Sequence, residues 1–473
     1  MKKHILTSVF ISSITALFAQ HHDIHEKPEM WKGRHNKTTD STSLLHAFKT
    51  GQTHGHFRYF MSSTINNGKL KDYYANAIGG GIRYETNKFY NFQFAVSGFY
   101  FFNIGSSRLA DPDEYSGQMN RYEIGLFDIE NPDNHKDMDR LEELYLKYNL
   151  KKGQITFGRQ LINTPLINLQ DGRMRGTGVE GLWMDFSPNS KWRFEGGWLY
   201  AFSPRSTTKW FKTSESIGIY PSGVNINGTK SNHYQHLQTA GVGVISAKYT
   251  PTPKWELQTW DYLIDNILNT AFVQVKYERP VPKNAKIILA TQFIRQDAIN
   301  TGGNPDPSMS YTVKGAKSMT FGGKVGLKIK NIEYSLNYNR ITKDGRYLFP
   351  REWGRDPFFT FMPRERNEGF GDVHAVNAKI EYKKPTSNFK YSVGVGYYDL
   401  PDVKDVALNK YGLPSYYQLN LDMKYKLSRF VKGLDSQLLI VSKFQAGPTY
   451  GIAKYEINKV NMLLINVVLN YHF

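Results

Sequence analysis

Apolar and polar residues alternate along many segments of this chain, and a period of two is typical of β-strands with one apolar and one wetter face. In residues 389–397, Phe, Tyr and Val hold the odd positions, while Lys, Ser and Gly hold the even positions. Residues 417–425 and 319–330 alternate in a similar way. These segments predict strands that lie between an apolar and a polar environment.

The same test along the whole sequence predicts about eighteen strands, and an even number is typical of bacterial outer-membrane barrels. The predicted strands begin near residues 55, 73, 91, 141, 153, 178, 191, 240, 254, 269, 285, 318, 332, 374, 388, 415, 436 and 460.

After the second strand, short connections alternate with mostly long ones. The short turns, rich in Pro, Gly, Asn and Ser, lie at 86–88, 151–153, 188–190, 250–253, 280–282 and 384–387. The long loops lie near 103–139, 161–177, 202–238, 297–316, 343–372 and 399–414. Short periplasmic turns and longer outer loops are the barrel arrangement, whereas a soluble β-sandwich has no reason to sort its loops this way. We therefore predict an all-β fold, a transmembrane antiparallel β-barrel.

The composition fits a membrane barrel better than a bundle of apolar helices. Hydrophobic residues make up 40% of the chain, and the mean hydropathy is −0.51. In a barrel only alternate residues face lipid, so the average stays low. The 31 Tyr and 29 Phe residues fit aromatic girdles at the two membrane interfaces.

The formal net charge of +18 is spread along the whole chain, so we predict no nucleic-acid partner. The sequence contains no cysteine, which excludes disulfides, a thiol nucleophile and thiolate metal sites.

The N-terminus reads as an export signal. Lys2 and Lys3 precede an apolar stretch at 5–18 that is followed by Ala19, the pattern of a signal peptide over residues 1–19. The alternative, an N-terminal membrane anchor, is disfavoured because a spanning helix needs roughly 20 apolar residues. Export without another apolar helix, together with the strand pattern, predicts the outer membrane.

Residues 20–52 show no alternation, and we expect a periplasmic or plug-like segment before the barrel at 53–473. Seven histidines fall in or just after this stretch. Metal capture is the alternative, but the spacing matches no defined site, so we predict neither a metal nor a cofactor. The histidines are His21, His22, His25, His35, His46, His54 and His56.

The last strand alternates from Leu463 and ends in Phe473. A C-terminal strand with a final Phe is similar to the signal by which barrels are recognised for assembly, which makes the barrel assembly machinery an expected partner. The alternative is an ordinary last strand.

Several short motifs, in their order along the chain, resemble the OprD-like family of outer-membrane porins. They are GHFRYF at 55–60, NRYEIG at 120–125, FGRQ at 157–160, QDGRMR at 170–175, SPRS at 203–206, ESIGIYP at 215–221 and REWGRDP at 351–357. The resemblance implies an eighteen-stranded barrel with a narrow, occluded pore and a ladder of basic residues. It also implies small solutes, typically carboxylate-bearing ones such as amino acids.

The third outer loop is the candidate constriction. It follows Arg159 and carries Asp171, Arg173 and Arg175 close together. If this loop folds inward, its guanidinium groups would stand near the narrowest point and could bind carboxylates with two hydrogen bonds. The alternative is a loop clamped to the wall by Arg to Asp pairs.

Seven lysines extend this predicted positive path, because the alternation places each on the lumen face. A water-filled lumen would also tolerate any one of them, but together they favour anions. They are Lys147, Lys276, Lys324, Lys328, Lys379, Lys390 and Lys424. The seventh outer loop carries six more basic residues that could bind acidic lipopolysaccharide or gather anionic solutes, or could simply be solvated. They are Lys343, Arg346, Arg351, Arg355, Arg364 and Arg366.

The sequence thus predicts an outer-membrane porin, monomeric or trimeric, that passes small anionic or zwitterionic solutes. One alternative is a barrel enzyme such as a lipase or protease. Ser and His occur, for example His233 and His236, but no spacing suggests a nucleophile with its base. The other alternative is a binding or adhesive surface protein with a closed pore.

Overall fold

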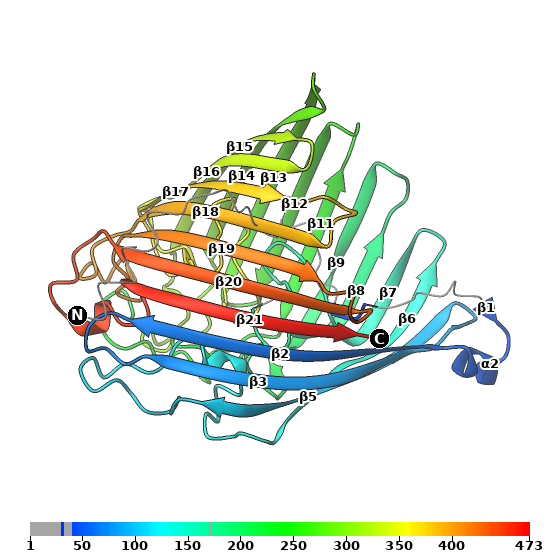
Figure 1. Ribbon diagram of the computed structural model, residues 1–473, viewed down its shortest axis with the longest axis horizontal. Coiled ribbons are helices and arrows are strands. Elements are labelled where there is room, and N and C mark those ends of the chain that lie inside the picture. Colours follow the sequence, from blue (N-terminus) through cyan, green and yellow to red (C-terminus); the bar gives the residue numbers. More distant parts are fainter. Residues whose placement is uncertain (1–29, 33–39, 170–171) are drawn as a thin grey trace.

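The alternating segments form the wall of a closed antiparallel β-barrel. The computed structural model describes residues 30–32, 40–169 and 172–473. Eighteen long strands make the wall, and the last pairs with the first along 56–66, which closes the sheet (Figure 1). Their bounds are β2 (Gln52–Asn66), β3 (Tyr73–Glu85), β5 (Phe92–Ser106), β6 (Met138–Leu150), β7 (Gly153–Gln160), β8 (Gly178–Phe186), β9 (Trp192–Ser203), β11 (Val242–Tyr249), β12 (Trp255–Ile264), β13 (Leu268–Val281), β14 (Ala285–Ala298), β15 (Lys317–Ile329), β16 (Ile332–Ile341), β17 (Val373–Tyr382), β18 (Phe389–Asp399), β19 (Tyr416–Lys426), β20 (Leu434–Gln445) and β21 (Met462–His472).

The remaining described elements are short. They are the strands β1 (Asp40–Ser41), β4 (Lys88–Phe89) and β10 (Phe211–Lys212), the helix α2 (Leu44–Lys49), and the 3-10 turns η1 (Ile124–Leu126) and η2 (Ala453–Tyr455). No helix in the described part of the chain is long and apolar enough to cross a membrane.

The predicted barrel is confirmed, and each predicted strand start lies within three residues of the observed one. The turn predicted at 280–282 is displaced, because Pro280 and Val281 still lie opposite Lys286 and Ala285 in the β13–β14 pair. This hairpin turns at 282–284 instead, where Lys283 and Asn284 take positive φ values.

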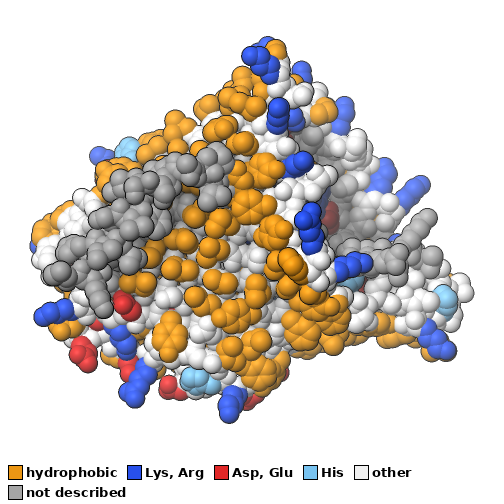
Figure 2. Space-filling view, in the orientation of Figure 1, with side chains coloured by type: hydrophobic (Ala, Val, Ile, Leu, Met, Phe, Trp, Pro, Cys, Tyr) orange, Lys and Arg blue, Asp and Glu red, His pale blue; other side chains and the backbone are white. Residues whose placement is uncertain are grey.

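The two faces of the wall differ in the way that the alternation predicts. In β2, one face carries His54, His56 and Arg58, all buried, whereas Phe57 on the opposite face is 54% exposed. Since the exposed face is apolar and the buried face is polar, the buried face lines the lumen and is covered by other parts of the chain. Figure 2 shows the exposed hydrophobic side chains gathered over the outside of the strands.

Loops of different length emerge at the two ends of the barrel. Short turns connect pairs such as β6–β7 and β15–β16, and they mark the periplasmic end. The opposite end carries the long connections at 107–137, 161–177, 204–241, 299–316, 342–372, 400–415 and 446–461. Two connections at this outer end are short, 67–72 and 265–267.

The seventh loop, residues 342–372, folds into the lumen, where side chains on the inner face of β14 and of β17 to β20 donate hydrogen bonds to its carbonyl oxygens. Buried carbonyl groups require such partners. The donor and acceptor pairs are Gln296 and Leu348 (2.6 Å), Gln292 and Pro357 (2.8 Å), Lys379 and Phe359 (2.6 Å), Lys379 and Phe361 (2.8 Å), Tyr398 and Thr360 (2.8 Å), Gln418 and Pro363 (2.8 Å), Asn420 and Pro363 (3.0 Å), and Lys443 and Arg364 (2.6 Å).

We expect Lys379→Met to loosen the seventh loop without unfolding the barrel. The substitution leaves the carbonyl oxygens of Phe359 and Phe361 without this donor, and a buried unsatisfied group costs about 1–3 kcal/mol. The free energy of unfolding in urea, measured in lipid vesicles, should fall by that amount. Lys328→Met is the matched control, because Lys328 is half-buried on a lumen face and its side chain forms no hydrogen bond with another described residue. Equal losses for both variants would contradict this role of Lys379.

Candidate pore and solute-binding cavity

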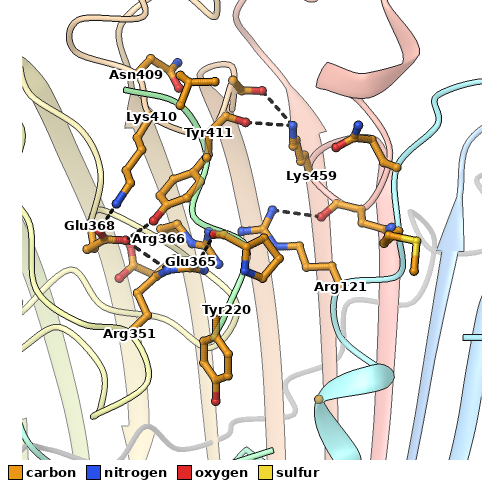
Figure 3. Close-up of a pocket in the computed structure, with 18 of the residues that line it drawn as sticks. Arg121, Tyr220, Arg351, Glu365, Arg366, Glu368, Asn409, Lys410, Tyr411 and Lys459 are labelled. Atoms are coloured by element: carbon orange, nitrogen blue, oxygen red, sulfur yellow. Dashed lines mark hydrogen bonds and ion pairs between the residues drawn. The ribbon is translucent and has the colours of Figure 1, made fainter. Parts of the chain in front are cut away.

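A cavity of about 720 Å³ lies between the outer loops. Its walls come from the connections at 107–137, 161–177, 204–241, 342–372, 400–415 and 446–461, so residues far apart in the sequence meet there (Figure 3). The seventh loop supplies one side of it, including Arg351, Asp356 and Arg366.

Trp353 joins three of these loops. It is fully buried, its ring stacks on Phe202 with centroids 4.2 Å apart, and its indole N–H donates to Ser216 Oγ at 2.9 Å. Its carbonyl oxygen accepts a hydrogen bond from the amide of Asn168 in the third loop, at 3.0 Å. The neighbouring Glu352 accepts from the amides of Gly218 and Tyr220. The third, fourth and seventh loops therefore form one packed unit.

Basic side chains outnumber acidic ones around the cavity. The acidic residues are Asp356, Glu365 and Glu368, and the basic residues are Arg121, Arg173, Arg205, Lys230, Arg351, Arg355, Arg366, Lys410, Lys454 and Lys459.

The three acids contribute little free negative charge. Glu368 is paired with Arg351 at 3.2 Å and with Lys410 at 3.7 Å, and it accepts a hydrogen bond from Tyr411. Burial, and then the charge of Glu368, raises the pKa of Asp356 to about 7. Burial also raises the pKa of Glu365 well above its usual value.

Several cations of the cavity are held by neutral groups. Lys459 Nζ donates to the carbonyl oxygens of Tyr411 and Gly412, at 2.9 and 3.2 Å, and Arg121 donates to that of Asn458 at 3.4 Å. The guanidinium of Arg366 lies over the Tyr411 ring, 4.7 Å from its centroid. Burial, followed by repulsion from Arg121, lowers the pKa of Lys459 to about 7. Such mutually repelling cations form a site that an anion would stabilise.

Arg173, a predicted site residue, faces this cavity. Its side chain lies against Gly125, where an added Cβ would come within 2.4 Å of Nε. Burial, followed by the charges of Arg364 and Arg205, lowers the pKa of Arg173 to about 9. Its buried Nε has no hydrogen-bond partner among the described residues. Asp171 lies outside the described residues.

Arg175 has a different role. It is buried in an ion pair with Glu142 of β6, and it contacts His56 Nδ1 at 2.9 Å. Its guanidinium also lies 4.3 Å from the centroid of Phe99 and 4.7 Å from that of Trp31. Glu142 and His56 belong to lumen faces of the wall, so Arg175 fastens the third loop to the barrel. Of the two arginines in this loop, Arg173 therefore lines the cavity, whereas Arg175 attaches the loop to the wall.

Arg159 is not brought together with Arg173. Its side chain is on the same face of β7 as the exposed Phe157, opposite the buried Gln160. Arg159 Nε pairs with Glu180 at 3.0 Å, and the guanidinium carbon of Arg159 lies over the Trp210 ring, 4.7 Å from its centroid.

The seven lysines are on lumen faces but do not meet at one site. Three are paired with acids: Lys147 with Glu85 at 2.6 Å, Lys276 with Glu278 at 2.9 Å, and Lys324 with Glu333 at 2.8 Å. Lys379 holds the seventh loop. Lys390 and Lys424 are cross-strand neighbours, and Lys328 lies opposite Glu333.

Sequence reasoning missed several residues of the cavity. Arg121 and Arg205 lie within motifs on which the family resemblance rests, and nothing else in the sequence marked them as site residues. Nothing in the sequence marked Lys410 or Lys459 as a site residue, because a single lysine in a loop shows no pattern and its position depends on how the loops pack together. Among the described residues, no cluster of His, Asp or Glu is arranged to hold a metal ion. His21, His22, His25 and His35 lie outside the described residues.

Comparison with known proteins identifies the family. The model of the outer membrane porin, OprD family, matches residues 115–362, which is just over half of the chain. Three solved structures share the fold at low sequence identity: Pseudomonas aeruginosa OccK8 (OprE), 13% identical with a TM-score of 0.70; Pseudomonas aeruginosa OpdK with vanillate, 11% identical with a TM-score of 0.68; and Acinetobacter baumannii OccAB4, 15% identical with a TM-score of 0.65. The alignments cover 90%, 90% and 89% of this chain and 99%, 99% and 98% of those chains. No curated protein matches. The chain belongs to the OprD family of outer-membrane porins.

Proposed function

We propose that this porin passes small anionic or zwitterionic solutes that bear a carboxylate, such as amino acids or peptides, by passive or facilitated diffusion. The observation that best supports this proposal is the cavity between the outer loops. There, carbonyl oxygens hold Arg121 and Lys459, and the Tyr411 ring lies against Arg366. Among the described residues these three side chains form no ion pair with a carboxylate, so the positive charge that they carry, which for Lys459 depends on pH, can act on a solute. A guanidinium group binds a carboxylate through two parallel hydrogen bonds, and buried fixed charges act more strongly than exposed ones.

The third loop supports the same proposal, in which it folds inward and narrows the pore. Arg175 ties it to Glu142 and His56 on the lumen face, and this clamp would hold Arg173 at the cavity. A passive channel needs such fixed groups to replace part of the hydration of the solute. The structure of OpdK was determined with vanillate, a small carboxylate, which is consistent with this solute class.

One contact bears on the enzyme alternative. Ser231 Oγ lies 2.9 Å from His233 Nδ1, both buried. Burial, followed by the charges of Lys410 and Arg351, lowers the pKa of His233 to about 3. Such a histidine is a weak general base near neutral pH. The channel is therefore the better supported function, and hydrolysis of a lipid or peptide by the pure protein would reverse this choice.

The plug-like role of the N-terminal segment is also a proposal. Trp31 lies over the Arg175 guanidinium, and Lys32 Nζ is 2.7 Å from a carboxylate oxygen of Asp435 on β20. Arg175 attaches the third loop to the wall, and Asp435 lies on a lumen face. Residues 30–32, which contact both of them, would therefore narrow the path for solutes below the third loop.

Removing the three cavity cations that form no ion pair within the described part of the chain should weaken anion selectivity. The variants are Arg121→Gln, Arg366→Gln and Lys459→Gln, measured by reversal potential in a KCl gradient across planar bilayers and by block with acetate. A charge-assisted hydrogen bond contributes about 1.5–3 kcal/mol, so half-block should need ~10-fold or more acetate. Lys209→Gln is the control, because its side chain is 67% exposed. Unchanged reversal potentials in all three variants would remove this cavity from the proposal.

Anion selectivity should fall as the pH rises from 6 to 9. Asp356, with its pKa raised to about 7, gains a negative charge over this range, and Lys459 and Lys410, with pKa values lowered to about 7 and about 8, lose positive charge. All three changes make the cavity less positive. Reversal potentials at stepped pH measure this effect, and Asp356→Asn should retain more selectivity at pH 9. A selectivity that is constant or rises with pH would contradict the assignment.

Trp31→Ala should raise the single-channel conductance if residues 30–32 narrow the lumen. The substitution removes the ring that covers Arg175 while leaving the Arg175–Glu142 pair in place. Trp255→Ala is a control at an exposed position of the outer wall. Equal conductance in the wild-type protein and the Trp31 variant would exclude the plug.

A further inference from the structure

Helix α2 packs against the outside of the barrel wall. Tyr84 of β3 alternates with Arg83 and Glu85, whose side chains reach Glu143 and Lys147 in the lumen. Tyr84 therefore faces outward. Its hydroxyl donates a hydrogen bond to the carbonyl oxygen of Phe48, and the two rings stack with centroids 6.4 Å apart. In Figure 1, α2 lies at the end of the barrel where β5 begins, which is the periplasmic end.

Several hydrogen bonds fix the helix in this place. The amide of Asn87 donates to the carbonyl oxygen of Ala47 at 2.9 Å, and its side chain donates to Thr50 Oγ1 at 3.2 Å. The amide of Asn91 donates to Asp40 Oδ1 at 3.1 Å, and β1 pairs with β4 in the same turn. Ser43 caps the helix by accepting from the amide of His46. The helix is thus attached at its start, its middle and its end.

The fixed helix presents an apolar face outward. Leu44 is 53% exposed, Leu45 64% and Phe48 44%, whereas Ala47 is buried. Leu44 and Phe48 are one turn apart, with Leu45 beside them, so these three side chains share one side of the helix. His46 is on the opposite side. A face of this kind in contact with water alone would be unfavourable.

This face continues the apolar outer surface of the wall. Ile82 of β3, Phe92 of β5 and Tyr148 of β6 are exposed on the outward faces of neighbouring strands, and Tyr90 is exposed in the turn to which the helix is bound. In an outer-membrane porin this surface is in contact with lipid, with aromatic residues at the level of the head groups.

We propose that α2 docks on the periplasmic leaflet of the outer membrane, with Leu44, Leu45 and Phe48 among phospholipid acyl chains. Lys49, in the last turn, can reach the phosphate groups while its stem stays with the apolar face. Short amphipathic segments bind membrane surfaces through this combination of apolar area and basic charge. The helix would then hold the start of the barrel domain at the membrane surface, whatever solute the pore passes.

The absence of cysteine from the chain allows a direct test. The full-length protein carrying Leu45→Cys is labelled with an environment-sensitive fluorophore and reconstituted in phosphatidylethanolamine and phosphatidylglycerol vesicles. We expect a blue-shifted emission and severalfold stronger quenching by acyl-chain doxyl lipids than in the matched variant His46→Cys, labelled on the polar side. Equal, water-like emission from both positions would overturn the proposal.

A second experiment tests whether another copy of the protein, instead of lipid, covers the apolar face of α2. Donor and acceptor labels at position 45 are mixed at low protein-to-lipid ratio. Energy transfer between barrels, without quenching by doxyl lipids, would show that a second copy covers the helix and would overturn the lipid assignment. Quenching without energy transfer supports it. Each variant is checked for the heat-dependent gel mobility of a folded barrel, and loss of anion selectivity would leave these readouts unchanged.

Discussion

Backbone groups enclosed in a barrel lumen must find hydrogen-bond partners there, and this requirement organises the interior of the protein. The strands satisfy their own amides and carbonyls in the wall. The carbonyl oxygens of the seventh loop instead depend on Gln292, Lys379, Asn420 and Lys443 from the lumen face. Because these donors come from β14, β17, β19 and β20, which lie within one continuous run of paired strands, the loop is held against that part of the inner wall. The position of the cavity follows from this.

The same constraint explains why positive charge is concentrated in the cavity. Three of the seven lysines on the wall are neutralised by nearby acids, as with Lys147 and Glu85 or Lys324 and Glu333. In the loops, by contrast, carbonyl oxygens bind Lys459 and Arg121 and fix their position without adding a negative charge, although burial lowers the pKa of Lys459 to about 7. A fixed positive region inside a low-dielectric wall attracts anions from a distance. The structure thus provides a physical basis for anion preference in the proposed function.

The barrel could be predicted from the sequence because its signal is local. Alternation around Tyr391 or Leu419 can be read within a few residues, and loop lengths order the strands. The site could not be predicted to the same extent, since it depends on contacts between loops. Arg173 and Arg175 look equivalent in the sequence, but only Arg175 meets Glu142. Likewise, the alternation placed Lys379 on the lumen face without indicating that two carbonyl oxygens of another loop would bind it.

If the protein works as proposed, ions and solutes pass through the basic cavity between the outer loops. Met119 lines this cavity and is 44% exposed, and the chain has no native cysteine. A Met119→Cys variant in planar bilayers can therefore be modified with small charged thiol reagents while the current is recorded. We expect modification to reduce the current, and we expect a negatively charged reagent to react faster than a positively charged one. Complete modification without any change in current would contradict it.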